Sequence, residues 1–229
     1  MEEPQRIDPF ELREQITQSE DVAVWHAVDD WTGVHVAIKV LMPGQSKDSF
    51  LLETSLWRSV DHPNLASIYA VSKYGGLPWV AMEYSDRTLA SLLTDPTPLD
   101  QELVSNIALA VARGLQAANQ AGFLITDVTP ATILLPDGGT PKVTTYASVH
   151  LTNDSDITGK IPSPKLPSYA SPEQVTARQF DQRSALYTFG ALLFQMLTGV
   201  APFSGSPEEI STQQRRRPTT PVHQIRKDV

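Results

Sequence analysis

Residues 122–135 read GFLITDVTPATILL and carry the most informative pattern in the chain. One aspartate, Asp127, follows a short apolar run, and a second apolar run closes the stretch at Ile133 to Leu135. A predicted helix precedes it and ends near Gly122. The apolar residues that recur along this helix are Leu103, Ile107, Val111, Leu115 and Ala118.

Outside this stretch, the spacing of hydrophobic residues is typical of strands in about the first hundred residues and of helices after them. A second apolar helix is predicted from Arg183 to Leu197, and the segment 148–168 is rich in Ser, Thr, Pro and Asp, which is typical of an exposed, mobile loop. The first hundred residues favour strands at 21–28, 34–41, 65–71 and 79–84, a turn at Gly75–Gly76 and one helix at 48–60. The sequence therefore predicts an α+β fold, with a small β-rich lobe joined near residues 85–87 to a mostly helical lobe.

Composition excludes several classes of function. The 229 residues have a formal net charge of −8, which argues against nucleic acid as a partner. There are no cysteines, which excludes disulfides and thiolate metal sites. The first residues, MEEPQRIDPF, are unlike a secretory signal, and no apolar run is long enough for a membrane helix. We expect a cytoplasmic domain, or the cytoplasmic segment of a longer, membrane-anchored protein, with no membrane contact of its own.

Six motifs occur in an order that resembles a protein kinase domain. They are VAIK (36–39), Glu53 followed by HPN (62–64), MEY (82–84), ITDVTPATILL (125–135), YASPEQ (169–174) and the helical stretch 181–205. The resemblance is greatest to the bacterial relatives of eukaryotic Ser/Thr kinases. It implies a bilobal protein-kinase-like fold with an N-lobe at 1–85, a C-lobe at 86–205 and a polar, basic tail or linker at 206–229.

The resemblance assigns three retained residues to phosphoryl transfer. Lys39 matches the lysine that contacts the nucleotide phosphates, and Glu53 matches the glutamate that holds this lysine. Asp127 matches the catalytic aspartate that orients the acceptor hydroxyl. A structural aspartate that caps nearby amides is the alternative for Asp127.

The same alignment indicates that the metal site is lost. Thr132 stands where the family has an asparagine ligand, and Thr145 stands where it has the aspartate of its DFG motif. Mg²⁺ prefers anionic oxygen ligands, and two hydroxyls bring no negative charge. We therefore expect no Mg²⁺ site. The carboxylates of Asp154 and Asp156 are interpreted as solvated acids rather than replacement ligands.

Other catalytic positions also depart from the family. Three positions of the glycine-rich loop carry side chains, which hinders a close approach to phosphates. The lysine that would contact the transferring phosphate, the His-Arg pair before the catalytic aspartate, and the aspartate that would brace the catalytic loop are also replaced. The residues found at these positions are Thr17, Ser19, Val22, Thr129, Ile125, Thr126 and Ala185.

The apolar framework of the family is kept. By resemblance, Val24, Ala37 and Leu134 would enclose an adenine ring, Met82 would guard the back of the slot, and the backbones of Glu83 and Ser85 would face adenine. A hydrophobic column between the lobes would consist of Trp57, Ile68, Ile125 and Tyr146. Any binding of ATP is therefore expected to be weak or independent of metal.

The C-terminus suggests an incomplete C-lobe. Kinase domains usually continue for several helices after the position of APFSG (201–205), so the C-lobe is expected to be truncated after its long helix. The chain is then either a fragment or a shortened lobe, and the arginine that would pair with Glu173 lies outside it. Apolar surface on the helix around Leu186 to Leu197 would be exposed or covered by a partner.

Together these features favour a pseudokinase, a catalytically impaired kinase-like domain that regulates or scaffolds protein partners such as an active kinase or a phosphopeptide-binding module. The alternative is an active Ser/Thr kinase that uses Lys39, Glu53 and Asp127 with atypical metal ligands. A nucleotide sensor without turnover is a third, nested possibility. Hydroxyl residues of the segment 148–168 are candidate phosphate acceptors, with a plain hydroxyl-rich loop as the alternative: Thr152, Ser155, Thr158, Ser163 and Ser168.

Overall fold

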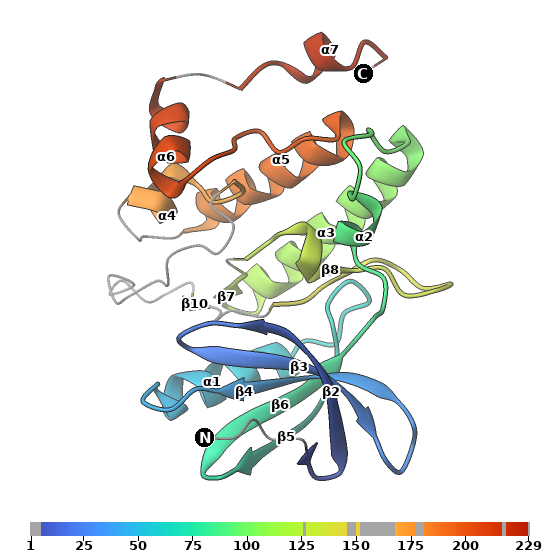
Figure 1. Cartoon of the computed structure of the whole chain (residues 1–229), viewed down its shortest axis with the longest axis vertical. Coiled ribbons are helices and arrows are strands. Elements are labelled where there is room, and N and C mark those ends of the chain that lie inside the picture. The colour runs from blue at the N-terminus through green and yellow to red at the C-terminus, as the bar shows by residue number, and fades with distance from the viewer. Residues whose placement is uncertain are drawn as a thin grey trace.

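Two lobes follow one another along the chain, a sheet with one helix and then a group of helices (Figure 1). The computed structural model describes residues 6–125, 127–145, 150–151, 168–176, 181–216 and 219–228. The α+β, bilobal architecture expected from the sequence is confirmed.

The N-lobe contains an antiparallel six-stranded sheet in the order β1-β2-β3-β4-β6-β5. Its strands are β1 (Arg6–Ile7), β2 (Phe10–Gln18), β3 (Val22–Asp29), β4 (His35–Leu41), β5 (Ile68–Tyr74) and β6 (Leu77–Glu83). The sequence predicted β3 to β6 but not β1 or β2. In β2 the register against β3 shifts twice, between Leu12 and Glu14 and between Gln15 and Thr17, which interrupts the alternation by which a strand is recognised.

Each face of this sheet has its own apolar core. One cluster includes Phe10, Ile38 and Trp79, and the other includes Val24 and Phe50. Phe50 lies on helix α1 (Lys47–Arg58), which begins at Ser46, whose side chain accepts a hydrogen bond from the amide of Ser49. Helix α1 therefore packs against the second face, the face that carries the predicted adenine slot.

The turn between β5 and β6 is the predicted glycine pair. Gly75 and Gly76 have φ of 56° and 78°, and Tyr74 pairs with Leu77 across the turn. Two consecutive residues with positive φ are what a two-residue hairpin of this hand requires, and glycine adopts them without strain.

The C-lobe is built on two long helices, α3 (Gln101–Gln120) and α5 (Gln182–Thr198). Shorter elements surround them: α2 (Leu89–Leu92), β7 (Phe123–Leu124), the 3₁₀ helix η1 (Pro130–Thr132), β8 (Ile133–Leu134), β9 (Lys142–Val143), β10 (His150–Leu151) and α4 (Pro172–Thr176). The C-lobe core takes in Ile107 and Val111 of α3 and Leu192 and Met196 of α5, and Trp57 of α1 reaches into it. On α3 the buried residue of the first turn is Val104, whereas the predicted Leu103 is exposed.

The segment 206–229 differs from the expected tail. It forms α6 (Pro207–Arg216) and α7 (Val222–Ile225), and Ile210 of α6 is fully buried. Acidic residues in the first turn of α6 and Arg215 and Arg216 in its last turn match the helix dipole. Figure 1 shows α6 beside α4 and α7 beside the C-terminal half of α5. The polar composition of the segment concealed these helices.

The exposure of α5 is uneven along its length. Leu186 near its start is 68% exposed, whereas Leu192 and Met196 are buried. The predicted apolar surface is therefore confined to the N-terminal part of this helix. Arg226, just after α7, donates from its guanidinium to the carbonyl oxygen of Leu99 at 2.6 Å.

In the described ranges, none of the helices combines the length and the hydropathy that a membrane crossing requires.

Candidate functional site

The loop of residues 125–132 lies between β7 and β8, and two of its apolar side chains anchor it in the core. Ile125 and Val128 are buried in the core shared by α3 and α5. Asp127 lies between them in the sequence and is half-buried. Thr126 lies outside the described residues.

The charges of Glu53 and Asp127 both act on Lys39, although Glu53 lies on α1, Asp127 in the loop after β7 and Lys39 on β4. Lys39 on β4 is buried, and its ammonium lies 5.8 Å from the centre of the Phe50 ring. Burial lowers the pKa of Lys39, while the carboxylates of Glu53, Asp127 and Asp21 act in the opposite direction. The three residues retained from the kinase pattern therefore share one electrostatic site between the lobes.

The threonines at the two metal-ligand positions are buried, and their hydroxyls make local hydrogen bonds. The hydroxyl of Thr145 donates to Oδ1 of Asp127. The hydroxyl of Thr132 lies 2.7 Å from the backbone carbonyl oxygen of Asp127 and 3.0 Å from the amide nitrogen of Thr129, which donates to it. Thr129, which the sequence alignment places at the position of a lysine in the family, forms a capping box with Thr132 at the start of η1.

Three side chains of the predicted adenine slot, Val24, Ala37 and Met82, pack together, and all four predicted side chains are buried. Val24 of β3 and Ala37 of β4 have no exposed surface, and Met82 and Leu134 are also buried. Val24, Ala37 and Met82 share one apolar cluster, against which Ile16 of β2 packs. Ile16 was missed because the strand that carries it was not recognised.

Glu83 ends β6 and ties the link between the lobes to β9. Its carboxylate lies 2.8 Å from the ammonium of Lys142, and both side chains are largely buried, at 14% and 20% exposed. The same carboxylate accepts a hydrogen bond from the amide of Ser67. The hydroxyl of Ser85 accepts from the amide of Arg87 at 3.2 Å. The predicted contact of these two backbones with adenine stays a prediction.

At the positions aligned with the glycine-rich loop, the side chain of Ser19 accepts hydrogen bonds from two backbone amides. Thr17 lies in β2, Val22 begins β3, and Ser19 lies in the turn between them. The hydroxyl of Ser19 accepts from the amides of Asp21 and Val22, at 3.3 and 3.1 Å. A serine that hydrogen-bonds amides two and three residues onward is a recognisable turn motif, so this contact was within reach of the sequence.

The hydrophobic column is partly visible. Trp57, Ile68 and Ile125 belong to the same core, and the indole nitrogen of Trp57 donates to the carbonyl oxygen of Ala66 at 2.7 Å. Tyr146, the two loop acids Asp154 and Asp156, and four of the candidate phosphate acceptors lie outside the described residues: Thr152, Ser155, Thr158 and Ser163. Ser168, the fifth, is half-buried just before α4.

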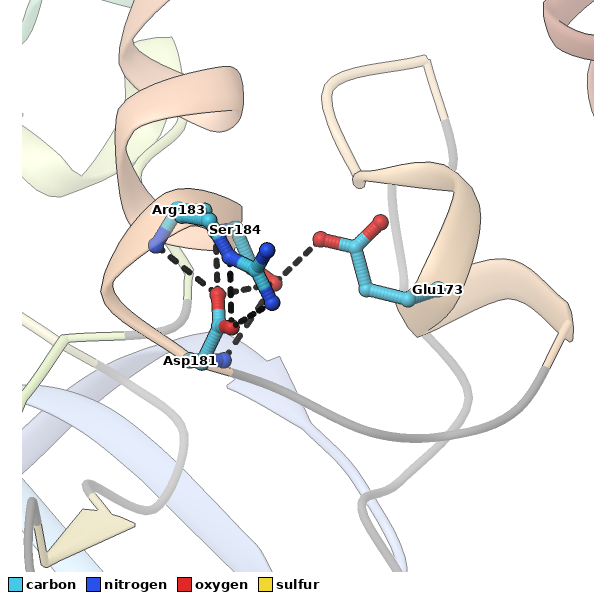
Figure 2. A network of polar contacts seen from close by, with 4 residues as sticks. All are labelled: Glu173, Asp181, Arg183 and Ser184. Atoms are coloured by element: carbon cyan, nitrogen blue, oxygen red, sulfur yellow. Dashed lines mark hydrogen bonds and ion pairs between the residues drawn. The ribbon is translucent and has the colours of Figure 1, made fainter.

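Glu173 finds a hydroxyl partner within the described chain. Figure 2 shows that its carboxylate faces Ser184 in the first turn of α5, whose hydroxyl donates to it. Asp181 caps this helix through the amides of Arg183 and Ser184, and the hydrogen bond from the Arg183 guanidinium lowers the pKa of Asp181. Next to this network, Ala185 is buried at the position of the bracing aspartate, so its methyl group offers the catalytic loop no hydrogen bond.

Comparison with known proteins agrees with this geometry. The model of the protein kinase domain matches residues 10–228. A probable serine/threonine-protein kinase of Streptomyces coelicolor is 30% identical over 96% of this chain and 35% of its own length, and one of Clostridium acetobutylicum is 27% identical over the same shares. The serine/threonine-protein kinase PknL of Mycobacterium tuberculosis is 32% identical over 74% of this chain and 44% of its own.

The chain thus spans about a third of the length of the first two relatives. The two-lobed fold, the gathered Lys39, Glu53 and Asp127, and the match over residues 10–228 lead to one conclusion. This chain belongs to the protein kinase family.

Proposed function

We propose that this chain is a pseudokinase, a kinase-family domain with impaired phosphoryl transfer that acts by binding other proteins. The observation that carries the proposal is the hydrogen bond from the hydroxyl of Thr145 to the carboxylate of Asp127. In a working kinase the residue at the position of Thr145 holds a metal ion, and the residue at the position of Asp127 receives the proton of the acceptor hydroxyl. Here the hydroxyl of Thr145 donates a hydrogen bond to the carboxylate of Asp127, which in a working kinase would accept the proton of the acceptor hydroxyl.

The residues present do not fit a Mg²⁺ ion. Mg²⁺ requires near-octahedral oxygen ligands and favours carboxylates, whereas Thr132 and Thr145 offer neutral hydroxyls. The hydroxyl of Thr132 is also engaged with backbone groups of Asp127 and Thr129. Within the described residues, no group of three or more His, Asp or Glu side chains converges on a possible metal position. We therefore derive no catalytic step that passes through this ion.

The hydrogen bonds in the turn between β2 and β3 are a reason to expect that this chain binds phosphate only weakly. Backbone amides of this loop are the groups that cradle phosphates in the family. The amides of Asp21 and Val22 already donate to the hydroxyl of Ser19. A phosphate group would have to displace these hydrogen bonds.

The apolar slot supports nucleotide binding that is weak or independent of metal. Because Val24 and Ala37 have no exposed surface, an adenine ring could contact them only after neighbouring side chains such as Ile16 had moved. The cost of that movement would reduce the apparent affinity for ATP. A nucleotide that bound under these conditions would act as a sensor ligand rather than a substrate.

Restoring the two metal ligands tests the proposal. We would titrate ATP with and without Mg²⁺ or Mn²⁺ in a thermal-shift assay, and measure phosphate transfer to a generic protein substrate. The wild-type chain is expected to show no transfer and no metal-dependent shift. The double variant Thr132→Asn/Thr145→Asp is expected to gain a metal-dependent shift of several degrees, as saturation at 100 times the dissociation constant adds about 2.7 kcal/mol.

The control for this experiment is Thr94→Asp, which places the same charge on an exposed loop and should behave as wild type. Transfer by the wild-type chain with Mg²⁺ or Mn²⁺, abolished by Asp127→Asn, would overturn the proposal. It would establish the alternative, an ATP-dependent Ser/Thr kinase that uses atypical metal ligands. The gathering of Lys39, Glu53 and Asp127 favours this alternative, and so do the relatives named as kinases.

The partners of the module are proposed as proteins rather than nucleic acids or membranes. An active kinase that phosphorylates the Ser- and Thr-rich segment 148–168, or a module that reads the resulting phosphopeptide, fits a chain of net charge −8 in a cytoplasmic setting. Incubation with an active bacterial Ser/Thr kinase, followed by phosphosite mapping, would test this. Phosphate found only outside residues 148–168 would count against it.

A further inference from the structure

Two histidines meet on neighbouring strands at the edge of the N-lobe nearest to the link between the lobes. His26 lies on β3 and His35 on β4, and the register pairs His26 with Ala37 and His35 with Val28, so the histidines are diagonal neighbours. Nε2 of His26 lies 2.9 Å from Nδ1 of His35, and the ring centres are 4.9 Å apart. None of the kinase functions discussed above uses this pair.

The surroundings hold the pair in place and leave it open to solvent. The ring of His26 stacks on Tyr84, the first residue after β6, with centres 4.2 Å apart and planes 8° from parallel. His26 is half-buried, whereas His35 is exposed. Glu14 faces His26 across β2 and β3, and the carboxylates of Glu14 and Asp86 both act on His26. The guanidinium of Arg13 acts in the opposite direction, so a cation approaching the pair from solvent would meet two imidazoles between two carboxylates and one positive charge.

The distance between the two nitrogens suits a shared metal ion. Metal–nitrogen bonds of about 2.0–2.1 Å place two ligands about 2.9 Å apart at a right angle and about 3.3 Å apart in a tetrahedron. The 2.9 Å spacing matches the right-angle separation of square-planar Cu²⁺ or Ni²⁺ and is a few tenths of an ångström shorter than the tetrahedral separation for Zn²⁺. To bind either kind of ion, the rings must turn so that the unprotonated faces of both nitrogens point to it. Without metal, one ring donates its N–H to the other, so the pair is also satisfied as a plain hydrogen bond.

We propose that His26 and His35 form a binding site for a divalent transition-metal ion of the Cu²⁺, Ni²⁺ or Zn²⁺ class, next to the link between the lobes. No third His, Asp or Glu ligand converges on the pair within the described part of the chain, so water completes the coordination. The hard ions Mg²⁺ and Ca²⁺, which take oxygen ligands, are excluded by this chemistry. The site shares no residue with the predicted adenine slot and includes neither Thr132 nor Thr145.

A bound ion would fasten β3 to β4 beside the Tyr84 ring. Both strands carry walls of the adenine slot, Val24 on β3 and Ala37 on β4. The ion would therefore stabilise the slot in its present form, which gives the site a route to influence nucleotide binding. Any such coupling would be reciprocal, with nucleotide altering the affinity for metal by the same factor.

The test is a titration of the untagged 229-residue chain, without nucleotide, with Cu²⁺, Ni²⁺, Zn²⁺ and Mg²⁺ by calorimetry and thermal shift. We expect one saturable site, with Cu²⁺ bound most tightly as the usual order of divalent ions requires, and no response to Mg²⁺. His26→Gln and His35→Gln should each weaken binding at least tenfold, and His223→Gln on α7 should leave it unchanged.

Two readouts separate loss of the site from loss of the fold. His35 is exposed, so His35→Gln is expected to keep the circular dichroism spectrum and melting temperature of the metal-free wild type. The electron paramagnetic resonance spectrum of the Cu²⁺ complex should show nitrogen ligands that disappear in this variant. Equal binding by wild type, His26→Gln and His35→Gln, or no binding of any of the three ions by wild type, would overturn the proposal.

Discussion

The apolar core and the polar site around Asp127 follow the family pattern to different extents. This core, called the framework below, is the one that α3, α5 and Trp57 share. Trp57, Ile125 and Leu192 are buried in one shared core, as the family pattern requires of them. At the site, Thr132 and Thr145, which the sequence alignment places at metal-ligand positions of the family, donate hydrogen bonds to Asp127. Burial of apolar surface stabilises the fold whether or not the domain is catalytic, whereas buried charges cost stability unless a ligand or ion compensates them. On the proposed function, only the second group has lost the reason for which a kinase keeps it.

The largest effect is expected in the framework. Leu192→Ala should lower the free energy of unfolding by about 2–5 kcal/mol, because it leaves a cavity beside α3. Leu186→Ala on the same helix, at an exposed position, should change it by less than about 0.5 kcal/mol. Urea unfolding followed by circular dichroism measures both. Equal losses would mean that α5 is not packed as described.

Close packing between α3 and the loop after α1 gives the next effect. A Cβ at Gly114 would lie 2.5 Å from the backbone oxygen of Asn64, which also accepts the amide of Val143. Gly114→Ala should therefore destabilise the domain by about 1–3 kcal/mol. Gly190→Ala on α5 meets nothing within 4 Å, and should stabilise the helix by up to about 1 kcal/mol. A lower melting temperature for Gly114→Ala and a higher one for Gly190→Ala, each relative to wild type, would support this prediction. An unchanged melting temperature for Gly114→Ala would contradict it.

The start of α5 tests a polar contact within the framework (Figure 2). Ser184→Ala removes the hydroxyl that donates to Glu173 and receives the amide of Asp181, so we expect a loss of about 1–2 kcal/mol. Ser105→Ala, which removes an exposed hydroxyl from α3, serves as the control and should cost less than about 0.5 kcal/mol. If the two variants unfold at the same urea concentration, the contact with Glu173 contributes nothing.

At the catalytic position the expected effect on stability is smaller. Thr145→Val keeps the shape but removes the donor to Asp127, and water can replace it because Asp127 is half-buried, so about 1 kcal/mol or less should be lost. Thr188→Val, which removes a hydroxyl bonded to the carbonyl oxygen of Ser184 at 3.0 Å, reports the cost of the same change in the framework. If Thr145→Val lowers the free energy of unfolding more than Thr188→Val does, hydrogen bonds at the site contribute as much to stability as those in the framework, and the comparison fails.

Ion pairs at the surface should matter least. Arg87 and Asp137 lie 2.9 Å apart with side chains 56% and 84% exposed, so Arg87→Met should cost about 0–1 kcal/mol and even less at high salt. The less exposed pair of Lys142 and Glu83 should be less sensitive to salt. Unfolding of Arg87→Met and Lys142→Met at 0.05 and 1 M NaCl would compare them, and an equal salt response would show that burial of the second pair is unimportant.

Elements with regular apolar spacing were predictable, and those without it were not. Strands β3 to β6 and helices α1, α3 and α5 follow the predicted segments within a few residues. Strand β2 escaped notice because its two register shifts break the alternation, and α6 because only Ile210 and Ser211 of its ten residues are buried. At the site, the identity of Thr132 and Thr145 was readable, but the bond from Thr145 to Asp127 was not.

The sequence by itself determined the family pattern and the order of the lobes, because both depend on residue type and spacing along the chain. It also predicted uncharged residues at two metal-ligand positions, which stays a prediction. Only the tertiary structure decided what those residues do. Contacts such as Thr145 with Asp127, Glu83 with Lys142 and His26 with His35 join segments that fold side by side. Their geometry depends on packing of the lobes and strands, which the spacing of residues along the chain does not specify.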